Sequence, residues 1–425
     1  MLISSPVPLF LSLCTLFSSC SARAERARYP ADGGRGALKL TTQDRAGDEA
    51  TNGTIAPKVF IISMYSDEEE VWYNIPEFDI LSQNITVPGF SPSFPDAHCT
   101  SDGTICHLVT GEAEINAAST ISALIYSRTF NLATTYFLIA GVAGVSPKVT
   151  TIGSVTFARF AVQVALQYQI DAREIPTDWP TGYVPQGSYS PDQYPGYIYG
   201  TEVFELNDAL RQRVIDFASN VTLVDSEDAQ AVRANYANTS LYGPGADTPS
   251  VVACDTATSD VWFSGSLLGE TFENTTLLFT NGTAVYCTTQ QEENATLESL
   301  MRGALSGLVD FSRIIIMRSA SDFDRQFEGQ SASDNLLGET PGYDIALTNL
   351  YLVGVKVVEG IVEEWEETFE KGVQAENYVG DILGSLGEKP DFGPQSVSGE
   401  AVSEKRSFSG RKGRRADRRR HRLNL

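Results

Sequence analysis

The sequence predicts an α/β fold in which helices flank one central mixed sheet. Short buried strand signatures, such as 58–63 and 312–317, alternate along the chain with helical segments such as 110–128. This alternation is typical of α/β domains. Of the 425 residues, 42% are hydrophobic and 10% are aromatic. That composition supplies a large core and excludes a chain that is disordered throughout.

The first half of the predicted domain opens on the buried strand at 58–63. Acidic residues follow at 67–70 and start a helix, because carboxylates are favoured near helix N-termini. A second helix, rich in small residues, covers 110–128. Strands are predicted at 134–140 and 149–157. The glycines after the first of them are expected to form a turn where a backbone can approach a ligand closely.

The second half begins with a stretch at 176–199 that is rich in proline, tyrosine and glycine and predicts an irregular loop. The remaining predicted elements are a helix at 206–218, a strand at 256–263, a helix at 295–309, a strand at 312–317 and a long helix at about 346–371.

The beginning of the chain predicts a secretory signal peptide. Residues 6–17 are apolar, and small residues follow at 18–24. An uncleaved anchor is the alternative, because no positive charge precedes the apolar run. The longest other apolar stretch, 133–145, is interrupted by glycines and is shorter than the roughly 20 residues that a membrane span needs. We therefore expect no membrane span elsewhere.

Composition divides the chain into four regions. The Arg-, Gly-, Asp- and Thr-rich segment after the signal lacks periodicity, and the last residues are polar and basic. The predicted regions are a signal peptide at 1–24, a flexible lead-in at 25–56, a folded domain at 57–395 and a disordered basic tail at 396–425.

Glycosylation motifs support secretion. Asn-x-Ser/Thr sequences begin at Asn52, Asn84, Asn220, Asn238, Asn274, Asn281 and Asn294. Together with the signal peptide they favour an extracellular or cell-wall location. In the tail, Lys405 and Arg406 resemble a dibasic processing site.

Four cysteines lie outside the predicted signal peptide, and an oxidising compartment favours disulfides between them. Four cysteines allow three pairings. Cys99 and Cys106 are close enough in sequence to close one loop, which leaves Cys254 and Cys287 for a second bridge. We expect no metal site and no cofactor, because the chain has only three histidines and no Cys-x-x-Cys pair.

The charge argues against nucleic acid as a partner. The whole chain has a net charge of −23. Residues 401–425 contribute +8, so the other residues together carry −31. A body this acidic repels a phosphate backbone.

Acidic and aromatic residues follow several predicted strands. They are the acids at 68–70, Ser321 and Asp322, the pair Glu292 and Glu293, and Trp262. In α/β sheets, ligands bind at the carboxyl ends of strands. Carboxylates accept hydrogen bonds from sugar hydroxyls, and an indole offers a flat apolar face. The set favours a neutral, polyhydroxylated ligand with a ring that can stack.

Each of these residues also has a structural interpretation. The acids at 68–70 and at 292–293 could be solvated charges at helix starts. Asp322 could cap a helix, and Trp262 could belong to the core. The order of the motifs along the chain favours the functional interpretation.

That order resembles the nucleoside phosphorylase superfamily, especially the methylthioadenosine/adenosylhomocysteine nucleosidases. More closely, residues 58–395 resemble the purine nucleoside permease family of fungi and bacteria. The stretches that carry the resemblance are 61–71 (IISMYSDEEEV), 110–118 (TGEAEINAA), 139–145 (IAGVAGV), 152–155 (IGSV), 287–294 (CTTQQEEN), 318–322 (RSASD) and 390–393 (PDFG). The resemblance implies a single nucleoside-phosphorylase-like domain.

The resemblance also implies roles for individual residues. Asp322 matches the aspartate that protonates purine N7, and Glu70 matches the glutamate that activates water. Glu292 or Glu293 matches the glutamate that binds ribose, and Trp262 matches an aromatic against the base. The backbone turn beneath the ligand corresponds to Gly141, Ala143 and Gly144.

Departures from the family pattern favour water over phosphate as the nucleophile. Ile139 and Val142 stand where phosphorylases place an Arg and a Ser. Arg159 and Arg318 are the nearest cations that could rebuild a phosphate site, and either could instead pair with an acid. Asn294 begins a glycosylation motif beside the expected ribose carboxylates, where a glycan would obstruct the site.

Three functions follow from these observations. A secreted nucleoside N-ribosyl hydrolase, or less favourably a phosphorylase, would release free purine bases for uptake. A nucleoside-binding protein would serve transport together with a membrane partner. A non-catalytic descendant of the fold is the third. A homo-oligomer is also expected from the resemblance, although the sequence shows no interface.

Overall fold

A computed structural model describes residues 54–394 and 396. The predicted signal peptide and the lead-in up to residue 53 lie outside the described residues, as does the basic tail beyond Ser396. Two boundary predictions are corrected. Ile55, within the predicted lead-in, pairs with Phe130. Ser396, within the predicted tail, is buried, and its Oγ accepts a 2.9 Å hydrogen bond from the Phe392 amide.

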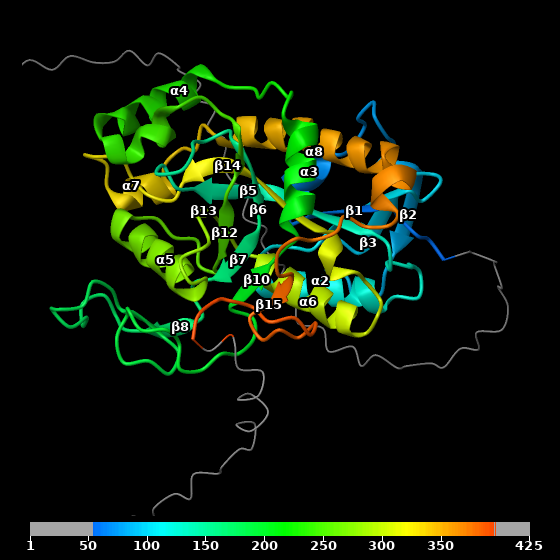
Figure 1. Cartoon of the computed structure of the whole chain (residues 1–425). Helices are drawn as coiled ribbons and strands as arrows, with labels where there is room; N and C mark the ends of the chain where they lie inside the picture. Colours follow the sequence, from blue (N-terminus) through cyan, green and yellow to red (C-terminus); the bar gives the residue numbers. More distant parts are fainter. Residues whose placement is uncertain (1–53, 395, 397–425) are drawn as a thin grey trace, which may run out of the picture. The chain divides into compact units, whose positions relative to one another are not determined.

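A mixed sheet of thirteen strands organises the described residues (Figure 1). Its main path runs in the order β15-β10-β7-β12-β13-β5-β1-β4-β3-β2, while β14 pairs with β5 and β6, and β11 pairs with β6. β8 and β9 form a separate ribbon. The strands are β1 Val59–Ser63, β2 Gln83–Thr86, β3 Asp96–Cys99, β4 Ile105–Val109, β5 Tyr136–Val145, β6 Val155–Ala158, β7 Phe160–Gln163, β8 Gln167–Gln169, β9 Tyr183–Pro185, β10 Val203–Glu205, β11 Val251–Ala253, β12 Asp255–Thr258, β13 Tyr286–Gln290, β14 Ile314–Phe323 and β15 Gly380–Asp381.

Helices flank this sheet. The α-helices are α1 Ser66–Glu70, α2 Ala113–Tyr126, α3 Asp208–Ala218, α4 Glu227–Ala234, α5 Ser266–Phe279, α6 Glu293–Leu305, α7 Ala332–Leu337 and α8 Tyr343–Glu363. Short 3-10 turns lie at Ile80–Ser82, Asn235–Asn238, Ser240–Ala246 and Phe311–Arg313, and a π-helical turn, η5, covers Trp365–Phe369. The predicted α/β architecture with a mixed sheet flanked by helices is confirmed.

The core has one layer on each face of the sheet, because successive side chains of a strand point to opposite faces. Phe60 and Ile62 of β1 join a cluster that includes side chains of α2 and α6. Val59 and Ile61 join a second cluster that includes side chains of α3 and α8. The strands β1, β5 and β14 run parallel in the middle. Burial on both faces explains why these strands are nearly continuous apolar runs in the sequence.

The predicted glycine turn after the middle strand is wrong. Residues 141–144 continue β5 to Val145, because β14 pairs with them along their whole length. Conversely, the strand predicted at 149–157 begins only at Val155. The structural alternative for Asp322, a helix cap, does not apply, since Asp322 lies within β14.

One helix in the described part of the chain, α8, is long and apolar enough to cross a membrane by length and composition alone. The sequence analysis predicts a long helix at about 346–371 but does not single it out as a candidate membrane span. More than half of its apolar window is buried in the domain, where it packs against β14 and β5. In this structure α8 is a core helix.

Both predicted disulfides are present. Cys99 of β3 is bonded to Cys106 of β4, its direct neighbour across the antiparallel pair. Cys254, between β11 and β12, is bonded to Cys287 of β13.

Candidate functional site

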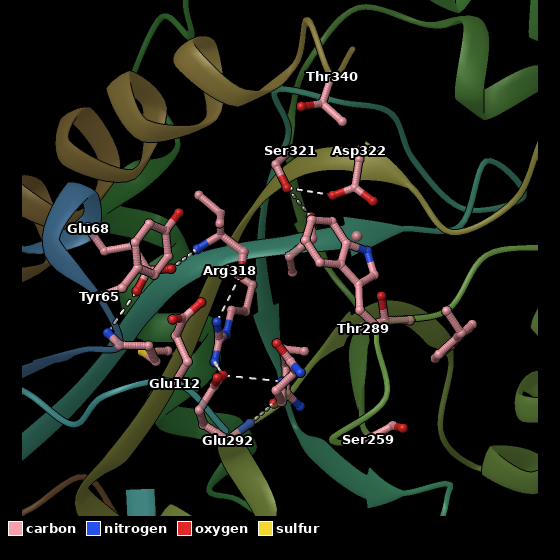
Figure 2. A pocket seen from close by; sticks show the side chains of 18 of the residues that line it. Tyr65, Glu68, Glu112, Ser259, Thr289, Glu292, Arg318, Ser321, Asp322 and Thr340 are labelled. Atoms are coloured by element: carbon pink, nitrogen blue, oxygen red, sulfur yellow. Dashed lines mark hydrogen bonds and ion pairs between the residues drawn. The ribbon is translucent and has the colours of Figure 1, made fainter. Parts of the chain in front are cut away.

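A cavity of about 260 Å³ opens where β1, β5, β13 and β14 end (Figure 2). It is lined by Met64, Tyr65 and Glu68 after β1, Glu112 before α2, Val142, Ala143 and Gly144 of β5, Ser259, Val261, Trp262 and Phe263 after β12, Thr289, Gln290, Gln291 and Glu292 at the end of β13, Arg318, Ser321 and Asp322 of β14, and Thr340 and Tyr343. The ends of five strands (β1, β5, β12, β13 and β14) and the starts of two helices (α2 and α8) therefore converge on one cavity.

Asp322 stands at one side of this cavity. Its Oδ1 accepts a 2.7 Å hydrogen bond from the Ser321 hydroxyl. Burial raises the pKa of the Asp322 carboxyl to about 6, while Ser321 and the Trp262 indole oppose that shift. The carboxyl group therefore keeps its proton to a higher pH than an ordinary aspartate does.

Trp262 lies on the same wall and is not a core residue. Its side chain lines the cavity with 62% of its surface exposed. An indole in this position offers a flat apolar face to a ring bound next to Asp322.

Gly144 makes room for the Asp322 side of the cavity. A Cβ at this position would lie 2.6 Å from Thr289 Oγ1 and 3.3 Å from Asp322 Oδ2. β14 has a bulge at this point, between Ala320 and Asp322, where its register against β5 shifts. Bulges change the direction of side chains. This bulge lies directly before Asp322, whose carboxyl group is next to Gly144.

On the opposite side, Glu68 rather than Glu70 enters the cavity. Glu68 is 1% exposed, and its two carboxylate oxygens accept hydrogen bonds from the amides of Met64 at 2.8 Å and Val142 at 2.7 Å. Burial raises the pKa of the Glu68 carboxyl to about 8, and Arg318 opposes the shift. Glu70 is exposed at the end of α1 and does not line the cavity. The choice of Glu70 is therefore corrected.

Between these carboxyl groups lies a buried ionic cluster. The Arg318 guanidinium donates to Glu292 at 3.1 Å, to Glu293 at 2.8 Å and to the Val142 carbonyl at 2.8 Å. Glu292 also accepts a 3.0 Å bond from the Ala113 amide. The two glutamates begin α6 but are 5% and 0% exposed, so they are not solvated charges.

The two glutamates of the cluster differ in their position relative to the cavity. Glu292 lines the cavity, whereas Glu293 lies behind it against Arg318. Burial raises the pKa of Glu293 to about 7, with Arg318 opposing. Gly141 also lies behind the cavity wall. A Cβ there would meet Glu68 Oε1 at 2.5 Å and Arg318 Nη1 at 2.8 Å, so the glycine leaves space for both side chains.

Arg159 does not belong to the site. Its guanidinium pairs with Glu205 with an Nε–Oε1 distance of 2.8 Å, and it does not line the cavity. Arg318 is therefore the one cation among the residues that line the cavity in the described part of the chain.

Asn294 cannot carry a glycan in this fold. It is 1% exposed, its amide donates to the Thr201 carbonyl at 2.7 Å, and its Oδ1 accepts from the Thr258 hydroxyl at 2.6 Å. The asparagines of the other described motifs, Asn84, Asn220, Asn238, Asn274 and Asn281, are exposed.

A family model described as purine nucleoside permease matches residues 56–374. The chain belongs to this family. It is 48% identical over 347 residues to a purine nucleoside permease of Candida albicans (strain SC5314 / ATCC MYA-2876), which covers 80% of this chain and 84% of that protein. It is 39% identical over 338 residues to a probable purine nucleoside permease of Schizosaccharomyces pombe (strain 972 / ATCC 24843), with 77% and 96% covered.

Solved structures with a similar fold are more distant. A 5'-methylthioadenosine/S-adenosylhomocysteine nucleosidase from Neisseria meningitidis, in complex with methylthio-immucillin-A, is 14% identical with a TM-score of 0.42, covering 72% of this chain and 99% of that one. A futalosine hydrolase of Helicobacter pylori strain 26695 is 15% identical with a TM-score of 0.42, covering 72% and 98%.

Several residues that line the cavity were not singled out from the sequence. Tyr65 and Tyr343 share a hydrogen bond of 2.9 Å between their hydroxyls, and Tyr343 also donates to Asp67 at 2.7 Å. Thr289 and Glu112 line the cavity too. Tyr65, Thr289 and Glu112 each lie inside one of the stretches that carry the family resemblance, so membership of those stretches was the available signal. Tyr343 had none.

Proposed function

We propose that this protein binds purine nucleosides and cleaves their N-glycosidic bond with water. The proposal rests on one observation: the cavity holds two buried carboxyl groups with raised pKa values, Asp322 and Glu68, on opposite sides of the buried cluster of Arg318 with Glu292 and Glu293. Paired groups of this kind suit acid and base roles near neutral pH. The exposed Trp262 supplies a surface for the base on the Asp322 side.

In the proposed reaction, Asp322 donates its proton to N7 of the purine as the bond between the base and the sugar breaks. Water forms the new bond to the anomeric carbon, and Glu68 accepts the proton that this water loses. The products are the free base and ribose. Glu292, fixed by Arg318 and by the Ala113 amide, is placed to accept hydrogen bonds from sugar hydroxyls.

Water is favoured over phosphate as the nucleophile. Arg318 already donates to two glutamates and a carbonyl, and the cavity wall carries the carboxyl groups of Glu68, Glu112, Glu292 and Asp322. An anion here would replace satisfied charge pairs and meet further carboxylates.

A nucleoside-binding protein that serves transport is the second candidate. It is favoured by the names of the relatives, which are called permeases. In this reading the carboxyl groups hold the ligand without cleaving it, and a membrane partner carries it onward.

One experiment separates these functions. The purified protein is incubated with adenosine, inosine or guanosine, with and without phosphate, and the mixture is analysed by chromatography for free base. We expect free base and ribose without phosphate. Base released only with phosphate would indicate a phosphorylase, and nucleoside binding without any base would favour the transport protein.

Three variants test the assigned roles. Asp322→Asn and Glu68→Gln are each expected to lower kcat by about 10²–10⁴-fold while nucleoside binding persists. Glu70→Gln is the matched control, since Glu70 lies on the same short helix but outside the cavity. Loss of activity in Glu70→Gln but not in Glu68→Gln would return the base role to Glu70.

We also propose that the protein is secreted. The exposure of five glycosylation motifs and the two disulfides support this location. Peptide mapping of protein from the culture medium is expected to find glycans at some of those five asparagines and none at Asn294. A chain found only inside cells, without glycans, would contradict the proposal.

A further inference from the structure

The Glu112 carboxylate differs from the other acids of the cavity. Glu68 accepts from two backbone amides, Glu292 pairs with Arg318, and Asp322 accepts from Ser321. The Glu112 carboxylate makes no hydrogen bond or ion pair with any residue that the structure describes, and only its main-chain carbonyl is bonded, to Asn116 Nδ2 at 2.7 Å. Glu112 is exposed, so its acceptor sites are open to solvent and to a ligand that enters the cavity.

The backbone around Glu112 is held in an unusual conformation. Ala113 has a φ of +72°, which a non-glycine residue rarely adopts. The Ala113 amide donates to Glu292 at 3.0 Å, and the Glu114 amide donates to Asp260 at 2.9 Å. Strained backbone of this kind persists where surrounding contacts enforce it, and such sites are often functional. Here the contacts that enforce it hold Glu112 at the cavity wall.

Glu112 lies on the side of the cavity away from Asp322. Figure 2 shows it with Tyr65, Glu292 and Arg318, on the side of Glu68 and away from Asp322. A nucleoside with its base between Asp322 and Trp262 directs its sugar toward this side. The one cation there, Arg318, already pairs with Glu292 and Glu293, so the charge of Glu112 is not compensated by it.

We propose that Glu112 is a specificity-determining residue: it accepts a hydrogen bond from a hydroxyl of the ligand's sugar and repels nucleoside 5′-phosphates. This inference rests on the proposed binding of nucleosides. A hydroxyl is neutral and donates to a carboxylate, whereas a phosphate monoester brings about two negative charges beside it. The site therefore selects nucleosides against nucleotides.

The test measures binding, so that it does not depend on cleavage. Asp322→Asn serves as the parent, because it is expected to bind without turnover. Equilibrium dissociation constants are measured for adenosine and for adenosine 5′-monophosphate. The variant adds Glu112→Gln, and the control adds Glu366→Gln, which lies in η5 and does not line the cavity. Since the Glu112 side chain caps no helix amide, the variant is expected to fold.

We expect the parent to bind adenosine at least about a hundredfold more tightly than the monophosphate. Glu112→Gln is expected to lower this preference about tenfold, and to weaken adenosine binding about tenfold through the lost charge-assisted bond. Added salt is expected to reduce the preference in the parent more than in Glu112→Gln, because it screens the repulsion.

Two contrary outcomes are distinguishable. If the parent binds adenosine but Glu112→Gln leaves the preference unchanged, the role of Glu112 is wrong and the proposed function stands. If the parent binds neither compound, the proposed function fails and this inference fails with it.

Discussion

Asp322 and Glu68 show how one physical cause can serve two opposite roles. Burial raises the pKa of both carboxyl groups, to about 6 and about 8. Their partners differ. Asp322 accepts from a hydroxyl at its own strand, whereas Glu68 accepts from an amide at each oxygen. Two bonded amides keep both Glu68 oxygens oriented as acceptors, whereas Asp322 is held by side chains alone in the described part of the chain.

The pH dependence of cleavage follows from these two groups. The proposed reaction needs Asp322 protonated and Glu68 ionised. Below about pH 6, Asp322 is protonated, and the ionised fraction of Glu68 rises with pH. Above about pH 8, Glu68 is ionised, and the protonated fraction of Asp322 falls. We therefore expect kcat/KM for adenosine to be highest between about pH 6 and pH 8 and to fall on both sides.

The measurement is a profile of kcat/KM from pH 4 to pH 10 in buffers of constant ionic strength. A rate that keeps rising beyond pH 9 would exclude Asp322 as the acid. A rate that does not fall below pH 6 would exclude Glu68 as the base.

At the scale of elements, β5 leaves space for the carboxyl groups on both sides of the cavity. Gly141 faces Glu68 and Arg318, and Gly144 faces Thr289 and Asp322, three residues further along the same strand. Because both glycines lie within β5, the strand leaves room for side chains on both sides of the cavity while it stays paired in the sheet.

Gly144→Ala is expected to fold but to lose activity. The new Cβ would lie 2.6 Å from Thr289 Oγ1, so Thr289 has to move, and Asp322 at 3.3 Å has to give slightly. A displacement of this size at a catalytic acid is expected to lower kcat by about tenfold to a hundredfold. Adding Thr289→Ala removes the closest atom and is expected to restore part of the rate. Additive losses in the double variant would show that the two positions do not interact.

Strands and helices were predicted from the sequence where their own residues show a clear pattern, and were missed where the structure depends on a pairing partner. The strands β1 and β14 were predicted because their apolar runs are continuous, and the helices α2 and α3 were predicted as well. The short strands β3, β4 and β13 were missed, because their pairing partners rather than their own residues define them. The glycines at 141 and 144 favour a turn because glycine is usual in turns, and only the pairing of these residues with β14 shows that they continue the strand.

The candidate site was predicted in outline and misplaced in detail. Asp322, Glu292 and Trp262 all line the cavity. The acidic triplet could not be resolved from sequence, because α1 is only five residues long and its direction against β5 decides which glutamate turns inward. Glu112 was not singled out, because it lies inside the helix predicted at 110–128, whereas α2 begins only at Ala113.

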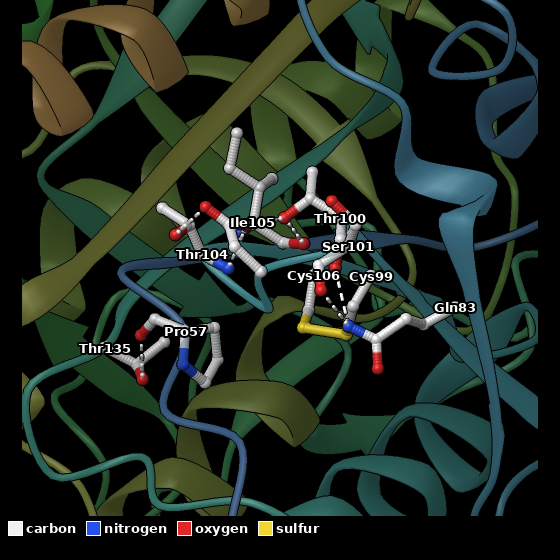
Figure 3. Close-up of a disulfide and its surroundings, with 10 residues drawn as sticks. Pro57, Gln83, Cys99, Thr100, Ser101, Thr104, Ile105, Cys106 and Thr135 are labelled. Carbon is white, nitrogen blue, oxygen red and sulfur yellow. Dashed lines mark hydrogen bonds between the residues drawn. A yellow bond between two sulfur atoms is a disulfide. The ribbon is translucent and has the colours of Figure 1, made fainter.

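For the whole molecule, the cavity depends on strands that are far apart in sequence and are held in register by the sheet. The two disulfides reinforce this register at different places. Cys99–Cys106 links β3 to β4 toward the edge of the sheet (Figure 3), while Cys254–Cys287 attaches β13 to the segment between β11 and β12. β13 leads directly into Gln290 and Glu292 at the cavity.

Removing the two disulfides is expected to have unequal effects. Cys254 and Cys287 are 33 residues apart, and Cys99 and Cys106 are 7 apart. The loss of loop-closure entropy corresponds to about 4 kcal/mol for the longer loop and about 2 kcal/mol for the shorter one. Paired Cys→Ser substitutions, followed by urea unfolding, are expected to lower the free energy of unfolding in that order.

The longer bridge is also expected to affect the ligand, because β13 carries Thr289 and ends beside Glu292. The Cys254→Ser/Cys287→Ser protein should therefore bind adenosine more weakly at temperatures where it remains folded, and the Cys99→Ser/Cys106→Ser protein should bind it as before. Equal losses of stability, or weaker binding in the second protein alone, would contradict this account. The bridge near the cavity would then have no special part in holding the site together.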